Sequence, residues 1–400
     1  MNQDFRRRED YRENQSTRSL SRNQAFAAAD NAVKPASVKR IIALIAVILV
    51  CFATAWTAHL YFSFNSVFGN GGQNTATSPK IAQKKPISVL ILGVDQGIEG
   101  RHDRGNSDTL ILATLNPDEN KATMTSIPRD TLADIQGADD GKENIFKINS
   151  AYEVGGNKAS VKTVSSLLNV PIDYYVEVNM KALKSLVDAV GGVDVQVPFN
   201  FTYDWCDFRK GKQHLNGRHA VAYVRMRHDD PKGDYGRQLR QRQVIEAVAK
   251  KAMSVNTLSN YKKLTKIFDK YVKTNLTFGD MISLAMNYRG CAGNLKSNYI
   301  QGHDAWIDGA SIQVAPTKEL QSKSNMIRKN LDLVPATLNN EETRQNKLNT
   351  INNNINWSNP DAFTNYQIFD KDSNGEASSS VNTQSQTNDS GENWFGKIFK

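Results

Sequence analysis

Five arginines lie within one short stretch of the sequence, from Ala222 to Gln243, and guanidinium groups are well suited to binding phosphate. A turn-rich segment, Pro231–Gly236, separates them into two groups. We expect Gly236 to open a helix whose first two turns are polar on nearly every side, which favours binding an anion over packing in a core. The alternative is a solvated basic face neutralised by nearby aspartates. The arginines are Arg225, Arg227, Arg237, Arg240 and Arg242, and the aspartates are Asp229, Asp230 and Asp234.

Two spacings in this stretch predict which side chains act together. Arg237 and Gln241 are four residues apart and share one face of the predicted helix. Arg225 and Arg227 are two residues apart and would point in nearly opposite directions on a helix, so we expect them at a helix end or on an extended exit from it. The stretch therefore offers donors to an anion from two successive segments.

A second group, Asp95, Asp108 and Arg129, flanks three short apolar runs that we predict to be buried strands. If the turn between the second and third runs is centred between Asp118 and Glu119, Asp108 lies opposite Arg129. Asp95 then lies nearby, because sequential strands are usually neighbours. The alternative is that the aspartates cap loops and the arginine forms an ordinary salt bridge. The runs are 87–93, 109–115 and 121–127.

These residue types indicate phosphoryl-group chemistry. The sequence contains no Cys/His metal-binding spacing, no Gly-x-Ser-x-Gly elbow and no P-loop, and its six histidines are scattered. Two aspartates, Asp95 and Asp108, suit Mg²⁺ (or Mn²⁺) that shares its shell with substrate phosphates, while arginines stabilise the charge on those phosphates. Asp130 and Asp234 are candidates for the base that deprotonates an attacking hydroxyl.

The elements that must position these residues alternate between strands and helices. Amphipathic helices are expected at 161–168 and 180–190, with further helices at 236–252, 259–273 and 278–289. Strands are expected at 174–178, 193–197 and near 306–314. The pattern predicts an α/β fold with a central mixed β-sheet flanked by helices, an α-β-α sandwich.

The N-terminal region predicts a membrane anchor. Residues 41–64 carry no formal charge and are long enough for a spanning helix, and Lys39 and Arg40 precede them. The positive-inside rule then places a basic tail, 1–40, in the cytoplasm and the rest of the chain outside the cell membrane. We expect a linker at 65–85, a catalytic domain at 86–333 and a disordered polar tail at 334–400. Cys206 and Cys291 both lie outside, where pairing is permitted but not required.

The net charge of +9 is spread along the chain and does not indicate a nucleic-acid partner. A cytoplasmic tail of about 40 residues without a helix-turn-helix pattern also argues against direct control of transcription. ATP is not expected outside the membrane, which leaves a phosphorylated lipid at the membrane surface as the natural substrate.

Taken together, seven motifs resemble the LytR–CpsA–Psr family over about residues 86–252. They are Gly93-Val-Asp95, Ser107-Asp-Thr109, Ser126-Ile-Pro-Arg-Asp-Thr131, Lys147-Ile-Asn-Ser-Ala-Tyr152, Gly191-Gly-Val-Asp-Val195, His214-Leu-Asn-Gly217, and Arg225-Met-Arg227 through Gly233-Asp-Tyr-Gly-Arg237 to Gln241.

The resemblance implies a Gram-positive envelope enzyme that transfers a glycopolymer, such as teichoic acid or capsule, from undecaprenyl pyrophosphate to peptidoglycan. It implies metal binding by Asp95 and Asp108 and an apolar pocket for the prenyl chain. Some members carry another arginine where this chain has Ala133, which removes one expected phosphate contact. The implied pyrophosphate-binding residues are Arg129, Arg225, Arg227, Arg237 and Gln241.

Three alternatives share most of these residues. A pyrophosphatase would differ only in that water attacks the phosphorus. A lipid-binding scaffold would use the arginines without catalysis, and an envelope regulator or transcriptional attenuator would act without transfer.

Overall fold

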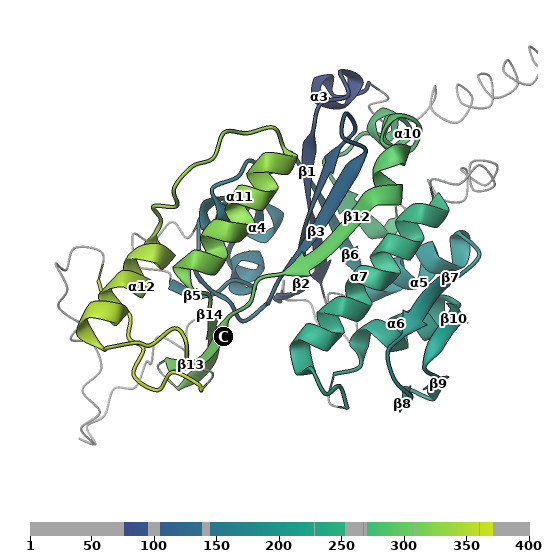
Figure 1. The fold of residues 1–400 in the computed structure, drawn as a ribbon. Coiled ribbons are helices and arrows are strands. Elements are labelled where there is room, and N and C mark those ends of the chain that lie inside the picture. Colours follow the sequence, from purple (N-terminus) through teal and green to yellow (C-terminus); the bar gives the residue numbers. More distant parts are fainter. Residues whose placement is uncertain are drawn as a thin grey trace, which may run out of the picture. The chain divides into compact units, whose positions relative to one another are not determined.

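The computed structural model describes residues 76–94, 105–137, 145–227, 229–252, 267, 270–307, 309–359 and 361–370. All of them belong to one of the chain's two compact units, residues 74–400. A six-stranded sheet in the order β11-β6-β1-β2-β3-β12 forms its centre (Figure 1). In chain order the strands are β1 (Ile87–Val94), β2 (Ser107–Asn116), β3 (Lys121–Ile127), β6 (Tyr174–Asn179), β11 (Val272–Thr274) and β12 (Leu295–Tyr299).

The sheet is mixed, as predicted. β1, β2 and β3 form an antiparallel meander, and β6 and β12 add to its two sides as parallel strands. β11 pairs antiparallel with β6. Two of these strands were not expected: β11 overlaps the end of the helix predicted at 259–273, and β12 lies in a polar segment with no strand pattern.

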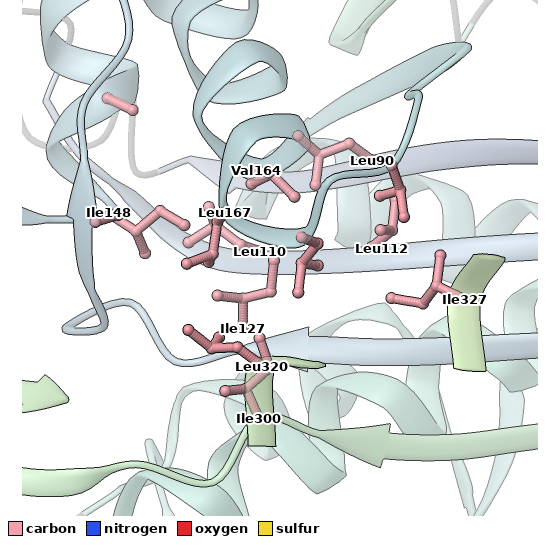
Figure 2. Packing of buried hydrophobic residues seen from close by; sticks show 14 of the residues in the cluster. Leu90, Leu110, Leu112, Ile127, Ile148, Val164, Leu167, Ile300, Leu320 and Ile327 are labelled. Atoms are coloured by element: carbon pink, nitrogen blue, oxygen red, sulfur yellow. The ribbon is translucent and has the colours of Figure 1, made fainter. Parts of the chain in front are cut away.

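Helices cover both faces of the sheet, so the predicted α/β class is confirmed. Alternate residues of β1 point to opposite faces. Leu90 and Leu92 pack beneath α4 (Ser150–Leu168) and α11 (Thr317–Asn330) (Figure 2). On the other face, Val89 packs in a cluster with residues of α10 (Phe278–Asn287), and α7 (Gly233–Ala252) crosses β3.

A smaller lobe follows β6 and presents the end of the arginine-bearing helix α6. The helices α5 (Met180–Ala189) and α6 (Gly217–Arg225) begin at asparagine caps, Asn179 and Asn216, whose side chains accept from the third backbone N–H of each helix. The predicted strand 193–197 forms as β7 (Val193–Val197), but it pairs with β10 (Gly211–Leu215) outside the central sheet. Its alternating burial explains this, because one side of β7 is solvent-exposed. β8 (Phe201–Tyr203) and β9 (Cys206–Phe208) complete the lobe.

The domain begins earlier than predicted. Within the expected linker, α3 (Pro79–Ala82) buries Ile81 completely, and Ser78 Oγ donates to Asp280 Oδ2 at 2.7 Å. Residues 1–75, which include the predicted tail and membrane span, lie outside the described residues. Within the described part of the chain, no helix combines the length and apolarity that a membrane crossing requires.

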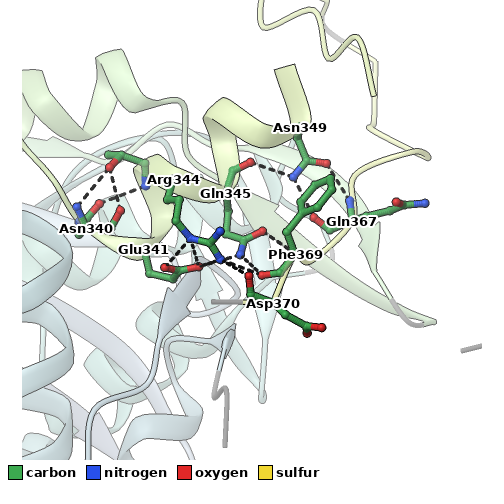
Figure 3. Close-up of polar contacts among 9 residues, drawn as sticks. Asn340, Glu341, Arg344, Gln345, Asn349, Gln367, Phe369 and Asp370 are labelled. Atoms are coloured by element: carbon green, nitrogen blue, oxygen red, sulfur yellow. Dashed lines mark hydrogen bonds and ion pairs between the residues drawn. The ribbon is translucent and has the colours of Figure 1, made fainter. Parts of the chain in front are cut away.

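The prediction of a disordered tail from residue 334 is wrong for residues 334–370. The hairpin β13 (His303–Ile307) and β14 (Ala310–Val314) packs against this segment, which contains α12 (Glu341–Asn352). Side-chain amides stand in for backbone partners: Gln345 exchanges two hydrogen bonds with the backbone of Phe369, and Asn349 two with that of Gln367 (Figure 3). The polar side chains whose abundance suggested disorder therefore form hydrogen bonds that stabilise this folded segment. Residues 371–400 lie outside the described residues.

Two short strands connect the sheet to this segment. β4 (Leu132–Asp134) pairs with β5 (Ile145–Lys147), and α12 packs on β4. The two described cysteines are free and lie in separate hydrophobic clusters, Cys206 in β9 and Cys291 just after α10, so they do not form a disulfide in this structure.

Candidate functional site

Asp108 and Arg129 meet at the open end of the β2–β3 hairpin. Leu110 pairs with Ile127, and continuing that register by two residues places Asp108 opposite Arg129, as the predicted turn required. Arg129 Nη1 donates to Asp108 Oδ1 at 2.6 Å, and both side chains are partly accessible. Burial tends to lower the pKa of Arg129, but the hydrogen bond to Asp108 and the charges of Asp130 and Asp234 outweigh it and raise that pKa above its ordinary value.

Lys147 joins this pair through Asp130 and was not among the predicted site residues. It ends β5 opposite Leu132, and its Nζ lies 3.1 Å from Asp130 Oδ1. Arg129 Nε lies 3.5 Å from the other carboxylate oxygen. Asp130 thus lies between two cations. The signal for Lys147 was present, since it opens one of the seven motifs, but its position depends on a β4–β5 pairing that periodicity does not reveal.

The first turn of α7 brings Asp234 and Arg237 into the same charge cluster. Their side chains form an ion pair, and Asp234 Oδ2 accepts from Gln238 Nε2 at 2.8 Å. Burial lowers the pKa of Arg237. Asp234 opposes that effect, while Arg129 and Arg227 add to it through like-charge repulsion. Arg237 therefore lies within electrostatic range of Arg129, and the two predicted groups of site residues converge.

Helix α7 differs from its prediction in two ways. It begins at Gly233, three residues before Gly236. Its first turns are polar but largely buried, so polarity did not mark an exposed face. Gln241, one turn after Arg237, is buried as well. The Nε atom of Arg237 is buried and has no hydrogen-bond partner among the described residues, so the cluster retains an unused donor.

Arg225 and Arg227 occupy the positions predicted for them. Arg225 is the last residue of α6, and Met226 follows in an extended conformation that carries the chain out to Arg227. Both arginine side chains are exposed. The charge of Arg227 acts on Arg237, whereas the interactions described for this part of the chain do not link Arg225 to the other site residues.

Arg240 is not a phosphate ligand but an internal clamp. It is completely buried, pairs with Asp230 through Nη1 and donates through Nη2 to the backbone oxygen of Met226. Its Nε donates to the backbone oxygen of Tyr223 at 2.9 Å. The alternative that nearby aspartates neutralise the arginines therefore holds for Arg240. Its ion pair with Asp230, however, lies in the interior and not on a solvated face. It ties the end of α6 to α7 and fixes the loop that carries Arg227.

Arg242 anchors α7 to the sheet. Its Nε donates to Ser297 Oγ and its Nη1 to Ser126 Oγ, both at 2.6 Å, and its guanidinium lies 5.8 Å from the ring centre of Tyr299. Burial lowers its pKa to about 10. Arg240 and Arg242 therefore stabilise the fold. The other three arginines of this stretch, Arg225, Arg227 and Arg237, remain available to bind a ligand.

The second predicted metal ligand, Asp95, lies outside the described residues. It directly follows Val94, which pairs with Ser107, the residue before Asp108. Among the described residues, no three or more His, Cys, Asp or Glu side chains are grouped so that they could hold a metal ion. The two residues that precede Asp108 in the sequence each have a buried side-chain oxygen without a hydrogen-bond partner, Asn106 Oδ1 and Ser107 Oγ. Oxygen atoms of this kind suit a hard divalent cation.

The fold and the charge cluster agree with a comparison of the whole sequence with known families. Residues 63–329 match the model of the LytR_cpsA_psr family, and the chain belongs to this family. Curated relatives include an Enterococcus faecalis protein, 40% identical over 301 residues that cover 74% of this chain and 98% of that protein. A Bacillus anthracis protein is 44% identical over 262 residues, which cover 65% and 84%. Both are named polyisoprenyl-teichoic acid–peptidoglycan teichoic acid transferase TagU.

Solved structures show the same relationship. A Streptococcus agalactiae protein aligns with a TM-score of 0.61 at 38% identity, covering 66% of this chain and 93% of that one. TagU of B. subtilis aligns with a TM-score of 0.51 at 38% identity, covering 63% and 100%. A structure described as TagT bound to LI-WTA aligns with a TM-score of 0.53 at 28% identity, covering 66% and 98%.

Proposed function

We propose that this protein transfers a glycopolymer from an undecaprenyl-pyrophosphate carrier to a peptidoglycan hydroxyl, forms a phosphodiester and releases prenyl phosphate. The observation that carries the proposal is the convergence of Arg129 and Arg237, from distant segments of the sequence, beside Asp108 and Asp234. Relatives named as teichoic acid transferases support this reaction class, and teichoic acid is the polymer we favour.

In the proposed reaction the pyrophosphate lies across Arg129, Arg227 and Arg237, with Arg225 and Gln241 as further donors. The acceptor hydroxyl attacks the sugar-side phosphorus, a new P–O bond forms, and the bond to the prenyl-phosphate oxygen breaks. The arginines stabilise the charge that develops on the leaving phosphate. Asp234 is our preferred base for the hydroxyl proton, because it pairs with one cation, Arg237, whereas Asp130 lies between two, Arg129 and Lys147.

We propose Asp95 and Asp108 as ligands for Mg²⁺ (or Mn²⁺). A magnesium site needs only one or two carboxylates when substrate phosphates complete its shell. Asn106 Oδ1, two residues before Asp108 in the sequence, is a further buried oxygen without a hydrogen-bond partner. When bound, the cation would neutralise phosphate charge at the sheet edge. A cation held there would compete with Arg129 for the Asp108 carboxylate.

The sheet face beneath α7 is suited to the prenyl chain. Ile91, Ala113 and Val176 lie on the central strands β1, β2 and β6 and pack beside the cluster around Val89, yet each remains partly exposed. On the opposite face Leu90, Leu92 and Leu112 are fully buried. Apolar side chains at the centre of a sheet are normally covered, so the face beneath α7 offers apolar surface to a ligand. Ala133 is fully buried in the cluster on the opposite face.

We further propose that residues 41–64 anchor the protein in the cell membrane as a single span, with residues 1–40 in the cytoplasm and the catalytic domain outside. This arrangement would put the catalytic domain on the outer side of the membrane, where we expect the carrier to present its pyrophosphate. It rests on the uncharged length of the segment and on Lys39 and Arg40.

The test uses the full chain in detergent with Mg²⁺, a prenyl-pyrophosphate-linked oligosaccharide and peptidoglycan fragments. Mass spectrometry follows the sugar. We expect sugar on the glycan with the wild type, loss of transfer in Arg129→Ala, and normal transfer in the matched control Arg218→Ala, an exposed arginine at the start of α6. Prenyl phosphate without sugar transfer would establish a pyrophosphatase instead. Tight carrier binding without turnover would favour a scaffold or regulator.

A further inference from the structure

Gln313 connects the two chain segments that bring arginines to the site. Its backbone N–H donates to the backbone oxygen of Asp130 at 2.8 Å, and the same residue forms a β-bridge with Thr131. Its side-chain Oε1 accepts from the Tyr235 hydroxyl at 2.7 Å. Asp130 follows Arg129 directly, and Tyr235 precedes Arg237 by two residues. One residue of β14 thus contacts both neighbourhoods.

The Tyr235 hydroxyl is held tightly at this junction. It accepts from the backbone N–H of Gly302 at 3.1 Å and from Gln301 Nε2 at 3.3 Å while it donates to Gln313. Its ring packs on Tyr299 with centroids 4.8 Å apart. Burial raises the pKa of Tyr235 to about 12, so the hydroxyl keeps its proton and remains a donor throughout the neutral range. Removing this hydroxyl would release the first turn of α7 from β14.

The hairpin that carries Gln313 is itself held by the C-terminal segment. Phe363 forms a β-bridge with Ala305, accepts from the Trp306 N–H at 3.1 Å and donates to the Asp304 backbone oxygen at 2.7 Å. The Asp304 side chain in turn accepts from Gln313 Nε2 at 2.7 Å. The family model ends at residue 329, so this support comes from a part of the fold that lies beyond it.

We propose that Gln313 and Tyr235 are positioning residues that set the distance between Arg129 and Arg237, with the hairpin β13–β14 braced by residues 353–369. The inference rests on the proposed transfer function. Neither residue contacts the pyrophosphate in this scheme. Both act through the arginines, whose separation must match the two phosphates of the carrier. Small displacements of catalytic groups lower the rate more than they weaken binding.

The test compares Tyr235→Phe, Gln313→Met and the double variant, with Tyr288→Phe as a matched control. Tyr288 is buried and donates to the Lys85 backbone oxygen at 2.6 Å beneath α10, so its variant loses the same kind of hydrogen bond away from the site. We expect each site variant to lower kcat/KM about tenfold, mostly through kcat. The double variant should lose less than the product of the two single losses, because both single variants break the same Tyr235–Gln313 hydrogen bond. Thermal unfolding should shift alike in Tyr235→Phe and Tyr288→Phe.

Equal activity in Tyr235→Phe and Tyr288→Phe would overturn the inference, as would losses that multiply in the double variant. Arg129→Ala, measured alongside, separates this failure from a failure of the proposed function. A fully active Arg129→Ala removes the transferase assignment itself. An inactive Arg129→Ala with an unimpaired Tyr235→Phe removes only the positioning role.

Discussion

Arg129 donates to Asp108 at 2.6 Å although 21 residues separate them, because the β2–β3 hairpin brings its two open ends together. The carboxylate partly neutralises a guanidinium that must also receive a phosphate. A phosphate group therefore competes with Asp108 for Arg129, and a cation on Asp108 would release the arginine for that role. The pair links metal binding to phosphate binding within one contact.

Asp108→Asn should lower magnesium-dependent transfer by roughly 100-fold or more, because an amide neither neutralises a divalent cation nor holds Arg129 as an ion pair. Stability should change little, since partly exposed ion pairs contribute about 1 kcal/mol or less. The measurement is initial transfer rate against Mg²⁺ concentration. Asp118→Asn, an exposed aspartate at the closed end of the same hairpin, is the control. Unchanged magnesium-dependent turnover in Asp108→Asn would remove Asp108 from the metal site.

Arg240→Met should destabilise the domain by about 3–5 kcal/mol, because it leaves the Asp230 carboxylate buried without its cation. Replacing both residues, as Arg240→Met with Asp230→Leu, should recover part of that loss. Urea unfolding of both variants measures the difference, and Arg218→Met serves as an exposed control. A loss below about 1 kcal/mol would show that the pair does not hold the loop.

Gly236→Ala should distort the start of α7. A Cβ at this position would lie 2.0 Å from Asp230 Oδ2, and that carboxylate is fixed by Arg240 and by the Lys232 N–H at 2.8 Å. We expect a stability loss of roughly 1–3 kcal/mol, typical of overpacking, together with weaker binding of prenyl pyrophosphate. Calorimetric unfolding and a ligand titration measure the two effects. Gly293→Ala, with open space around its Cβ, should change neither. Normal binding by Gly236→Ala would contradict the expected distortion.

Glu342 should make stability fall as pH rises. Burial raises the pKa of this carboxyl to about 7 in the folded state, against about 4.5 when unfolded. Below pH 4.5 both states hold the proton. Between about 4.5 and 7 only the unfolded state releases it, so unfolding becomes easier, and above about 7 the full penalty applies.

Glu342→Gln removes this titration and keeps an acceptor for the Asp134 N–H, which now donates to Glu342 Oε1 at 2.9 Å. The variant should match the wild type near pH 4.5 and unfold at a higher temperature near pH 8. Unfolding midpoints across this range test it, with exposed Glu119→Gln as the control. Parallel pH curves for wild type and Glu342→Gln would contradict the assignment.

Local patterns predicted the parts of the structure that depend on short separations. The hairpin register and the Asp108–Arg129 pair followed from one turn, and α5 followed from its apolar stripe. Contacts between distant segments could not be predicted this way. Lys147 reaches the site through β5, and β12 adds to the sheet from a segment whose polar residues accept Arg242 rather than showing alternation.

Composition misled in two places for one physical reason. The first turns of α7 and the segment after residue 334 are both polar, and both are packed. In each, the polar groups satisfy one another or the backbone, as Arg240 does for Met226 and Gln345 for Phe369 (Figure 3). A hydropathy scale includes the free-energy cost of burying a polar group. It does not include the hydrogen bonds to partners in the fold that compensate for this cost.

The parallel pairing of β12 with β3 also orders the events of folding. Ser126 pairs with Tyr299, so β3 remains an open sheet edge until residues far along the chain have been made. The β2–β3 hairpin needs only neighbouring residues and can form early, whereas β12 and the β13–β14 hairpin come late. An open edge is a template for wrong strand pairing during that interval. The β2–β3 hairpin, which carries Asp108 and Arg129, can thus form early in synthesis. The β13–β14 hairpin, which contacts α7 through Gln313 and Tyr235, is made near its end.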